Sequence, residues 1–262
     1  MNLLNRIKSA NKRLQCASQF TGSYLAAVYG FTRYKLNRTS QMNGTYKDIP
    51  FAFRSSDVEA LKEVLVNEDY KFLGDYIKQQ NNPVIIDAGH HIGCFSLWAL
   101  AQNPKANITA LEADPNTYKV AKKNAELAKA KGYDWKVLNK AAWTNNDPVS
   151  FSCDGDTMGH KVLKDGTMTI DGMSLESLLD QVGEPVTLMK VDIEGAEEAF
   201  LSGKDDLLKK IKALVIEIHP KYCNQNAVVE TLKKSFSHVE FIEDKQTDKP
   251  LVWCTNNPKQ SN

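Results

Sequence analysis

The sequence predicts a doubly wound α/β domain, in which helices cover both faces of a mainly parallel sheet. From Ile49 onward, short apolar runs alternate with longer segments of helical periodicity, and no internal repeat or low-complexity linker interrupts them. The chain has 262 residues and is 42% hydrophobic, which is enough for one large domain preceded by a short extension. Strands that are separated by helices imply right-handed crossovers and parallel pairing.

The expected elements follow one another in a regular order. Residues 57–67 have helical periodicity, and the apolar run at 83–88 is typical of a buried strand that leads into a helix at 95–102. A strand at 107–114 precedes a helix at 115–130, whose Pro115 suits a first helical turn. Further strands are expected at 135–143, 148–153, 186–195, 213–220, 238–244 and 250–255. Further helices are expected at 174–182, around Phe200, at 204–212 and at 226–236.

The first 47 residues form a basic extension. They contain eight Lys and Arg residues and no Asp or Glu, so the net charge of +1 leaves −7 (+1 minus +8) for residues 48–262. Apolar residues recur at helical spacing near the N-terminus, which predicts a short basic amphipathic helix. Three functions fit this helix: contact with anionic lipid, binding of an acidic partner or substrate, or targeting. The alternative is that its apolar stripe packs on the main domain.

Cysteine usage and hydropathy indicate the compartment. The five cysteines are odd in number and widely scattered, and they form no C-x-x-C pair. This pattern favours reduced thiols in the cytoplasm and argues against a zinc site. No run of about eighteen apolar residues occurs, so we predict no membrane-spanning helix. We therefore expect a cytoplasmic protein.

The strand at 83–88 runs into a glycine-containing loop. In a doubly wound sheet, ligands bind beyond the carboxyl ends of the strands, and here Asp87, Gly89 and Gly93 give the pattern D-x-G-x-x-x-G. Gly89 allows a turn that a Cβ would not tolerate, and Gly93 lets the backbone approach a ligand at a helix N-terminus. The spacing differs from the G-x-G-x-x-G of nicotinamide dinucleotide folds, which disfavours a dehydrogenase.

Carboxylates at the strand ends predict the kind of ligand. Glu112 ends the next strand, where a carboxylate can accept hydrogen bonds from both hydroxyls of a ribose. Asp87 would lie near the amino-acid portion of a ligand such as S-adenosylmethionine, where its charge could hold the ammonium group. Each carboxylate alone has an alternative as a helix N-cap or a solvated turn residue. Together with the glycines, they favour an adenosyl ligand.

A second group of ionisable residues is expected at the same edge of the sheet. The strand at 186–195 delivers Asp192 and Glu194, and the strand at 213–220 delivers Glu217 and His219. Such convergence is costly unless a cation binds or protons move. His219 is the first candidate for a general base and Asp192 the second, and the alternative for His219 is a capping role. The three carboxylates also offer oxygen ligands for Mg²⁺, although we assign no residue to a metal site.

These segments resemble the FkbM family of S-adenosylmethionine-dependent methyltransferases. The resemblance covers roughly residues 49–220, and its most specific part is "KVDIEGAE". It implies the class I methyltransferase fold, with seven strands of which the last is antiparallel, and methylation of an oxygen on a sugar or natural product. By position, the cofactor-binding residues of the family fall on Asp87, Gly89, Gly93, Glu112 and Asp192, and Glu194 completes its D-x-E-G motif. We also assign His91 and Asp114 to the cofactor site, and His90-His91 departs from the usual G-A-N-x-G wording.

The predicted function is in-line transfer of a methyl group from S-adenosylmethionine to a hydroxyl of a sugar, glycan or natural product. We expect a basic extension at residues 1–47 and a class I methyltransferase domain at 48–262. The alternative is a non-catalytic nucleoside-binding or scaffold protein that acts through its basic extension. A nucleic-acid partner is disfavoured, because the D/N-P-P-Y/W signature is absent and residues 48–262 are acidic.

Overall fold

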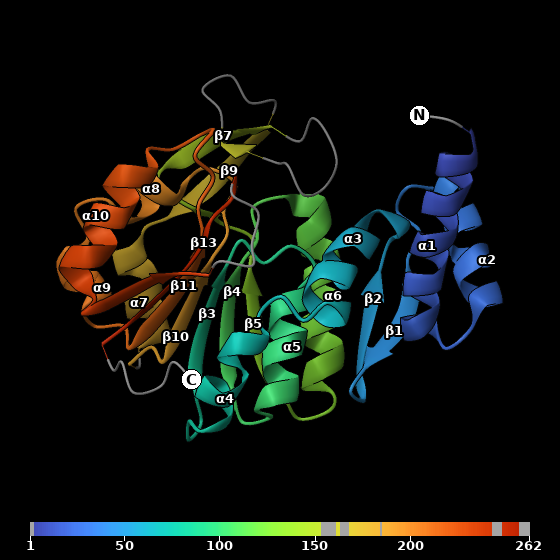
Figure 1. The fold of residues 1–262 in the computed structure, drawn as a ribbon, viewed down its shortest axis with the longest axis horizontal. Helices are drawn as coiled ribbons and strands as arrows, with labels where there is room; N and C mark the ends of the chain where they lie inside the picture. The colour runs from blue at the N-terminus through green and yellow to red at the C-terminus, as the bar shows by residue number, and fades with distance from the viewer. Residues whose placement is uncertain (1–2, 153–160, 163–167, 184, 243–247, 257–262) are drawn as a thin grey trace.

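A seven-stranded sheet forms the centre of the molecule (Figure 1). This computed structural model describes residues 3–152, 161–162, 168–183, 185–242 and 248–256. The strands lie in the order β12 (His238–Phe241), β13 (Leu251–Thr255), β11 (Ala213–Glu217), β10 (Leu188–Val191), β3 (Val84–Ala88), β4 (Asn107–Leu111) and β5 (Asp134–Leu138). The five strands from β11 to β5 are parallel, whereas β13 is antiparallel to both of its neighbours. The predicted sheet with an antiparallel last strand is confirmed.

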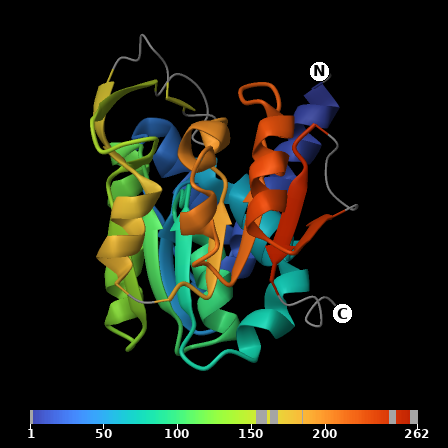
Figure 2. The same ribbon diagram turned by 90° about the vertical axis from the view of Figure 1, so that its left-hand side faces the viewer.

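Helices cover both faces of this sheet (Figures 1 and 2). The buried side chains form two hydrophobic clusters, one on each side of the sheet. One cluster includes α4 (Gly74–Lys78), α5 (Cys94–Gln102) and α6 (Pro115–Lys129), and the other includes α7 (Leu175–Val182), α8 (Glu197–Leu201), α9 (Asp205–Leu208) and α10 (Gln225–Ser235). The central strands are buried along their whole length, as a parallel sheet that is covered on both faces requires.

The N-terminal segment packs against one side of the domain. Helices α1 (Leu3–Thr21) and α2 (Tyr24–Leu36) pack on each other and on a hairpin of β1 (Met42–Tyr46) and β2 (Ile49–Phe53). Asn124 of α6 fixes the outer edge of β2: its Oδ1 accepts from the Ala52 N–H at 2.7 Å, and its Nδ2 donates to the Ala52 carbonyl at 3.0 Å. The boundary that we predicted after residue 47 falls in the hairpin turn, so the division into extension and domain stays a prediction.

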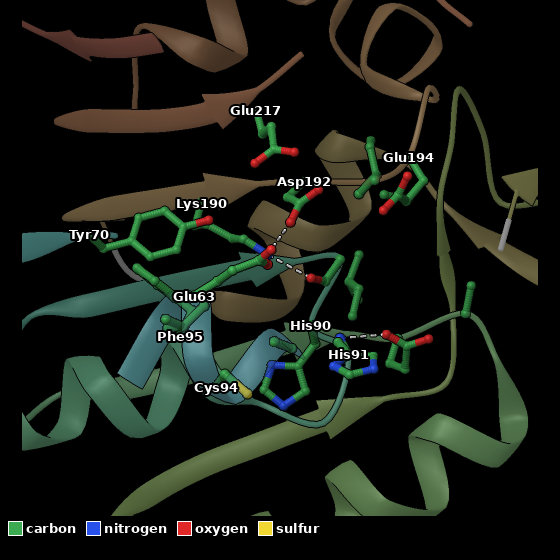
Figure 3. Close-up of a pocket in the computed structure, with 18 of the residues that line it drawn as sticks. Glu63, Tyr70, His90, His91, Cys94, Phe95, Lys190, Asp192, Glu194 and Glu217 are labelled. Carbon is green, nitrogen blue, oxygen red and sulfur yellow. Dashed lines mark hydrogen bonds and ion pairs between the residues drawn. The ribbon is translucent and has the colours of Figure 1, made fainter. Parts of the chain in front are cut away.

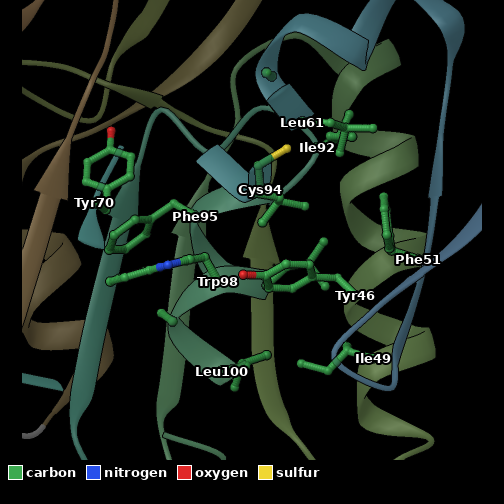
Figure 4. Packing of buried hydrophobic residues seen from close by; sticks show 14 of the residues in the cluster. Tyr46, Ile49, Phe51, Leu61, Tyr70, Ile92, Cys94, Phe95, Trp98 and Leu100 are labelled. Carbon is green, nitrogen blue, oxygen red and sulfur yellow. The ribbon is translucent and has the colours of Figure 1, made fainter. Parts of the chain in front are cut away.

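An aromatic cluster on and beside α5 supports one wall of a pocket. Trp98 of α5 is buried beside Phe95, with the ring centroids 6.0 Å apart, and Phe95 meets Tyr70 edge to face at 4.9 Å (Figure 4). Tyr70 precedes the short turn η3 (Lys71–Leu73). This aromatic cluster holds the Tyr70 side chain against the carboxyl ends of the strands.

Some elements differ from their predicted extent. The helix predicted at 57–67 is split into η1 (Ser55–Asp57), α3 (Val58–Leu61) and a π-helical turn η2 (Lys62–Val66). The strand predicted at 135–143 is interrupted, so that β5 and β6 (Ala141–Ala142) are separate strands. Strand β6 belongs to a separate four-stranded sheet with β7 (Pro148–Ser152), β8 (Lys161–Val162) and β9 (Met168–Met173). The helix predicted at 204–212 ends at Leu208, because the Lys212 N–H already bonds to Val186 at the entry to β11.

Candidate active site

A pocket lies at the carboxyl ends of β3, β4, β10 and β11 (Figure 3). Residues from the loops that follow these strands line it, together with residues from α3, η2 and the loop before η3. Of the predicted site residues, four contribute to the lining: Gly89, His91, Glu112 and Asp192. The other four, Asp87, Gly93, Asp114 and His219, are buried and are not among its lining residues. The sheet topology thus brings all of the predicted strand ends to one edge, as expected from parallel strands.

Gly89 occupies the point at which two strand ends meet. Its φ is +80°, and a Cβ at this position would lie 1.6 Å from the carbonyl oxygen of Asp192. The Asp192 N–H in turn donates to the Ala88 carbonyl at 3.0 Å. Only glycine fits here, both because of the φ angle and because the backbones touch.

Gly93 is closely packed at the start of α5. It precedes the first residue of α5 with a φ of +97°, and a Cβ there would lie 2.4 Å from Trp135 and 2.8 Å from His90 Nε2. Both the φ angle and these two rings therefore favour glycine at this position. An approach of the Gly93 backbone to the cofactor stays a prediction.

Asp87 sits at the centre of a buried polar cluster. Its Oδ2 lies 2.7 Å from His90 Nδ1 and accepts from Ser96 Oγ at 2.8 Å, and its Oδ1 lies 3.4 Å from Lys190 Nζ. Burial raises the pKa of Asp87, but Lys190 and His90 outweigh it and lower the pKa to about 2. Asp87 is therefore ionised, and it contacts His90 and Lys190, which themselves line the pocket.

Lys190 was missed by the sequence reasoning. This buried lysine of β10 donates to the Gly89 carbonyl at 2.6 Å and lies 3.5 Å from Asp192 Oδ2 (Figure 3). Burial acts to lower its pKa, but Asp87 and Asp192 together raise it, so the side chain stays charged. The sequence did contain a signal for Lys190, which is the only charged residue in the strand-like run "VTLMKV". A lysine in a buried strand indicates a charged partner nearby, because an unpaired lysine is almost never fully buried.

Glu112 is held by backbone donors at the end of β4. Its Oε2 accepts from the His91 N–H at 2.7 Å, and its Oε1 accepts from the Asp114 N–H at 2.8 Å. Burial raises the pKa of Glu112 to about 8, although both N–H groups act in the opposite direction. The carboxylate is thus oriented before any ligand arrives, and each oxygen keeps a further lone pair for a ligand hydroxyl.

His91 and Asp114 support Glu112 in different ways. His91 adopts a left-handed φ of 53°, which aims its N–H at Glu112, and its ring lies 3.5 Å from Asp57 Oδ1. Burial lowers the pKa of His91 to about 4, so its ring is neutral. Asp114 is the N-cap of α6 and accepts from the N–H groups of Asn116 and Thr117. A cofactor contact of Asp114 stays a prediction.

Three carboxylates surround one histidine at the ends of β10 and β11. His219 Nε2 lies 3.4 Å from Glu194, 3.5 Å from Glu217 and 3.9 Å from Asp192. The predicted convergence of these four groups is confirmed. Figure 3 shows the carboxylates of Asp192, Glu194 and Glu217 on the same side of the pocket as Lys190. Burial and the nearby Asp192 raise the pKa of both Glu194 and Glu217.

A buried glutamate orients His219. Glu197 of α8 is fully buried, and its Oε1 lies 2.8 Å from His219 Nδ1 and accepts from the Gly195 N–H at 3.0 Å. Burial lowers the pKa of His219, but the bond to Glu197 and the charge of Asp192 raise it to about 9. Sequence reasoning missed Glu197, because nothing in "GAEEAF" distinguishes a buried glutamate from an exposed one.

Five parallel strands followed by an antiparallel last strand, with a pocket at the carboxyl ends of the parallel strands, give this chain the fold of the class I methyltransferases. The family model described as "Methyltransferase FkbM domain" matches residues 87–246. The chain therefore belongs to the FkbM methyltransferase family, as its resemblance predicted.

The chain is similar to several known proteins. It is 26% identical over 171 residues to hexuronic acid methyltransferase AglP of Haloferax volcanii, and the match covers 62% of this chain and 69% of the relative. It is 26% identical over 168 residues to methyltransferase 1 of Beauveria bassiana, and this match covers 55% of this chain and 66% of the relative. Among solved structures, an S-adenosylmethionine-dependent methyltransferase from Agrobacterium tumefaciens aligns with a TM-score of 0.48 and 10% identity, covering 83% of this chain and 70% of that one.

Proposed function

We propose that this protein transfers the methyl group of S-adenosylmethionine to a hydroxyl of a sugar, a glycan or a natural product. The observation that carries the proposal is the pairing of two sites in one pocket. A pre-oriented Glu112 lies at one end, and a cluster of ionisable residues around Asp192 lies at the other. The name of the Haloferax volcanii relative, a hexuronic acid methyltransferase, supports an acceptor of the sugar class.

The residues around Glu112 fit the nucleoside part of the cofactor. Both carboxylate oxygens already accept one backbone hydrogen bond, and each can accept another from a ribose hydroxyl. Gly89 and His91 lie beside Glu112 in the pocket wall. Asp87 acts through Lys190 and His90, which its charge holds in place. When bound here, S-adenosylmethionine would supply a methyl group bonded to a positively charged sulfur. A hydroxyl oxygen can attack the methyl carbon and displace the sulfur.

Asp192 is the residue that we propose to receive the hydroxyl proton. Transfer forms an oxygen–carbon bond, breaks the carbon–sulfur bond and releases a proton, which a positioned carboxylate can accept. The Asp192 side chain is 29% exposed and lines the pocket. The His219 ring is 1% exposed and does not line it. His219, our first candidate from the sequence, is therefore proposed to act on the acceptor through Asp192.

Alignment of the acceptor oxygen with the methyl carbon and sulfur is expected to contribute most of the rate. Well-oriented reactions gain on the order of 7–11 kcal/mol from such positioning in favourable cases. The pocket also has an apolar wall, formed by Tyr70, Phe95 and Leu251. Such a wall suits the nonpolar face of a sugar ring or a natural product.

A divalent cation at the acidic cluster is the alternative role for Asp192, in place of proton uptake, and it would have to displace the proton of His219. One ligand atom each from Asp192, Glu194 and His219 lies within 4.8 Å of the others. Glu197 holds the far side of the His219 ring, which is the usual second contact of a metal-binding histidine. A set of two carboxylates and one imidazole suits Mn²⁺ as well as the predicted Mg²⁺. Turnover that is unchanged after chelation would remove this alternative.

The test is transfer of labelled methyl from S-adenosylmethionine to a panel of sugars, glycans and hydroxylated natural products. We expect Asp192→Asn to lower turnover by about 10²–10⁴-fold, the usual contribution of general acid–base catalysis. Asp206→Asn is the matched control, because its side chain is 94% exposed on α9. The alternative, a non-catalytic nucleoside-binding protein, predicts cofactor binding with no transfer to any acceptor.

A further inference from the structure

The outer face of α2, together with Ile7 of α1, exposes large apolar side chains. Leu36 is 85% exposed, Leu25 78%, Tyr29 65% and Ile7 57%. Val28 lies on the same side of α2 as Leu25 and Tyr29 and is also exposed. We call these five residues the outer face. Figure 1 shows α1 and α2 at the edge of the molecule, on the far side of the hairpin from the sheet.

Helix α2 is apolar on two opposite sides. Ala27, Gly30 and Tyr34 face inward and are buried, and Gly30 packs so closely on Met42 that a Cβ would lie 2.2 Å from its side chain. A surface helix normally carries polar residues opposite its buried stripe, and a helix that is apolar all round is normally covered. The exposed stripe of α2 is therefore not explained by packing among the residues that the structure describes.

The helices that carry this apolar surface also carry positive charge. Residues 1–47 carry eight Lys and Arg residues and no carboxylate, whereas the rest of the chain has a net charge of −7. Lys8, Lys12 and Lys35 are exposed. The Arg33 guanidinium lies 5.7 Å from the centre of the Tyr29 ring, so a cation stands directly beside the exposed aromatic side chain. An occupant of this surface must accept both cations and apolar side chains.

We propose that the outer face docks this methyltransferase on an anionic lipid bilayer. A bilayer interface accepts apolar side chains at the acyl boundary and attracts Lys and Arg with its headgroups. A second copy of the chain would bring eight further cations against the first eight. A nucleic acid would match the charge but leave the aliphatic side chains in water.

Vesicle flotation of the full chain tests the proposal without any methyl acceptor. Vesicles of phosphatidylcholine alone are compared with vesicles that contain about one-third phosphatidylglycerol. We expect binding to the anionic vesicles that weakens as salt is raised, since exposed charges are screened. The charge variant Lys8→Gln, Lys12→Gln, Lys35→Gln should lower the partition coefficient about a hundredfold, at the usual contribution of a cation near an anionic surface.

The apolar variant Leu25→Ser, Tyr29→Ser, Leu36→Ser should also lose vesicle binding. The control is Lys122→Gln, Lys129→Gln, Lys131→Gln, which removes three exposed cations from α6 and the turn after it and should bind like wild type. Equal binding to neutral and anionic vesicles, or equal binding of all three variants, would overturn the proposal. So would a dimer in sedimentation that the apolar variant dissociates, because the face would then belong to a second copy. None of these results depends on the proposed acceptor.

Discussion

Gly89 and Asp192 touch through their backbones: a Cβ on Gly89 would lie 1.6 Å from the Asp192 carbonyl oxygen. This contact joins the end of β3, which leads into the loop that we propose to bind the cofactor, to the end of β10, which leads into the acidic cluster. The two halves of the pocket are therefore fixed relative to each other by backbone geometry.

Gly89→Ala should be strongly destabilising. The new methyl group would force the two strand ends apart and would also strain a backbone with a φ of +80°. We expect a loss of at least about 3 kcal/mol in the free energy of unfolding, measured with denaturant. Gly132→Ala is the control, because its φ of +92° imposes similar strain while nothing lies within 4 Å of the added Cβ. Equal losses of unfolding free energy in the two variants would show that the clash with the Asp192 carbonyl oxygen adds no cost beyond the strain of the φ angle.

Lys190→Met should destabilise the protein by leaving Asp87 without its cation. Removal of one partner of a buried ion pair typically costs about 3–5 kcal/mol. The double variant Lys190→Met, Asp87→Asn removes the stranded charge, and we expect it to recover part of the lost unfolding free energy. A double variant less stable than Lys190→Met would contradict the pairing, and would point to the contacts of Asp87 with His90 and Ser96 as the more important ones.

Glu112 should make the stability of the cofactor-free protein depend on pH. Burial raises its pKa from 4.5 to about 8, so the contribution of Glu112 to stability is fully present below 4.5 and is lost as pH rises through 8. Between pH 5 and 8.5, wild type should lose unfolding free energy relative to Glu112→Gln, by an amount on the order of a few kcal/mol. Parallel pH profiles of the two proteins would show that Glu112 ionises normally. Glu126→Gln, on the exposed side of α6, is the control.

Much of the fold and of the pocket could be predicted, because the decisive signals are local. Alternating strands and helices predict a parallel sheet, and a parallel sheet brings the residues that follow its strands to one edge. This is why the sequence predicts that Glu112, Asp192 and His219 lie at the same edge of the sheet. The antiparallel last strand came from the family resemblance, since periodicity carries no information on strand direction.

The supporting residues could not be predicted, because their roles depend on burial and on partners distant in sequence. Lys190 matters through Asp87, which is 103 positions earlier in the chain, and Glu197 matters through His219. The packing of Gly93 on Trp135 could not be predicted either, because Trp135 lies on a different element, β5. The local sequence at Asp114 fits both an N-cap and a ligand contact, and the structure shows the N-cap.

The central claim is that Glu112 holds the ribose of the cofactor, and calorimetric titration with S-adenosylhomocysteine tests it most directly. Wild type should bind with micromolar affinity. Glu112→Ala should bind at least about tenfold more weakly, because the hydrogen bonds between Glu112 and the ligand are lost. Glu126→Ala should bind like wild type. If Glu112→Ala remains folded and binds S-adenosylhomocysteine as tightly as wild type, the cofactor is held elsewhere and the assignment of this pocket is wrong.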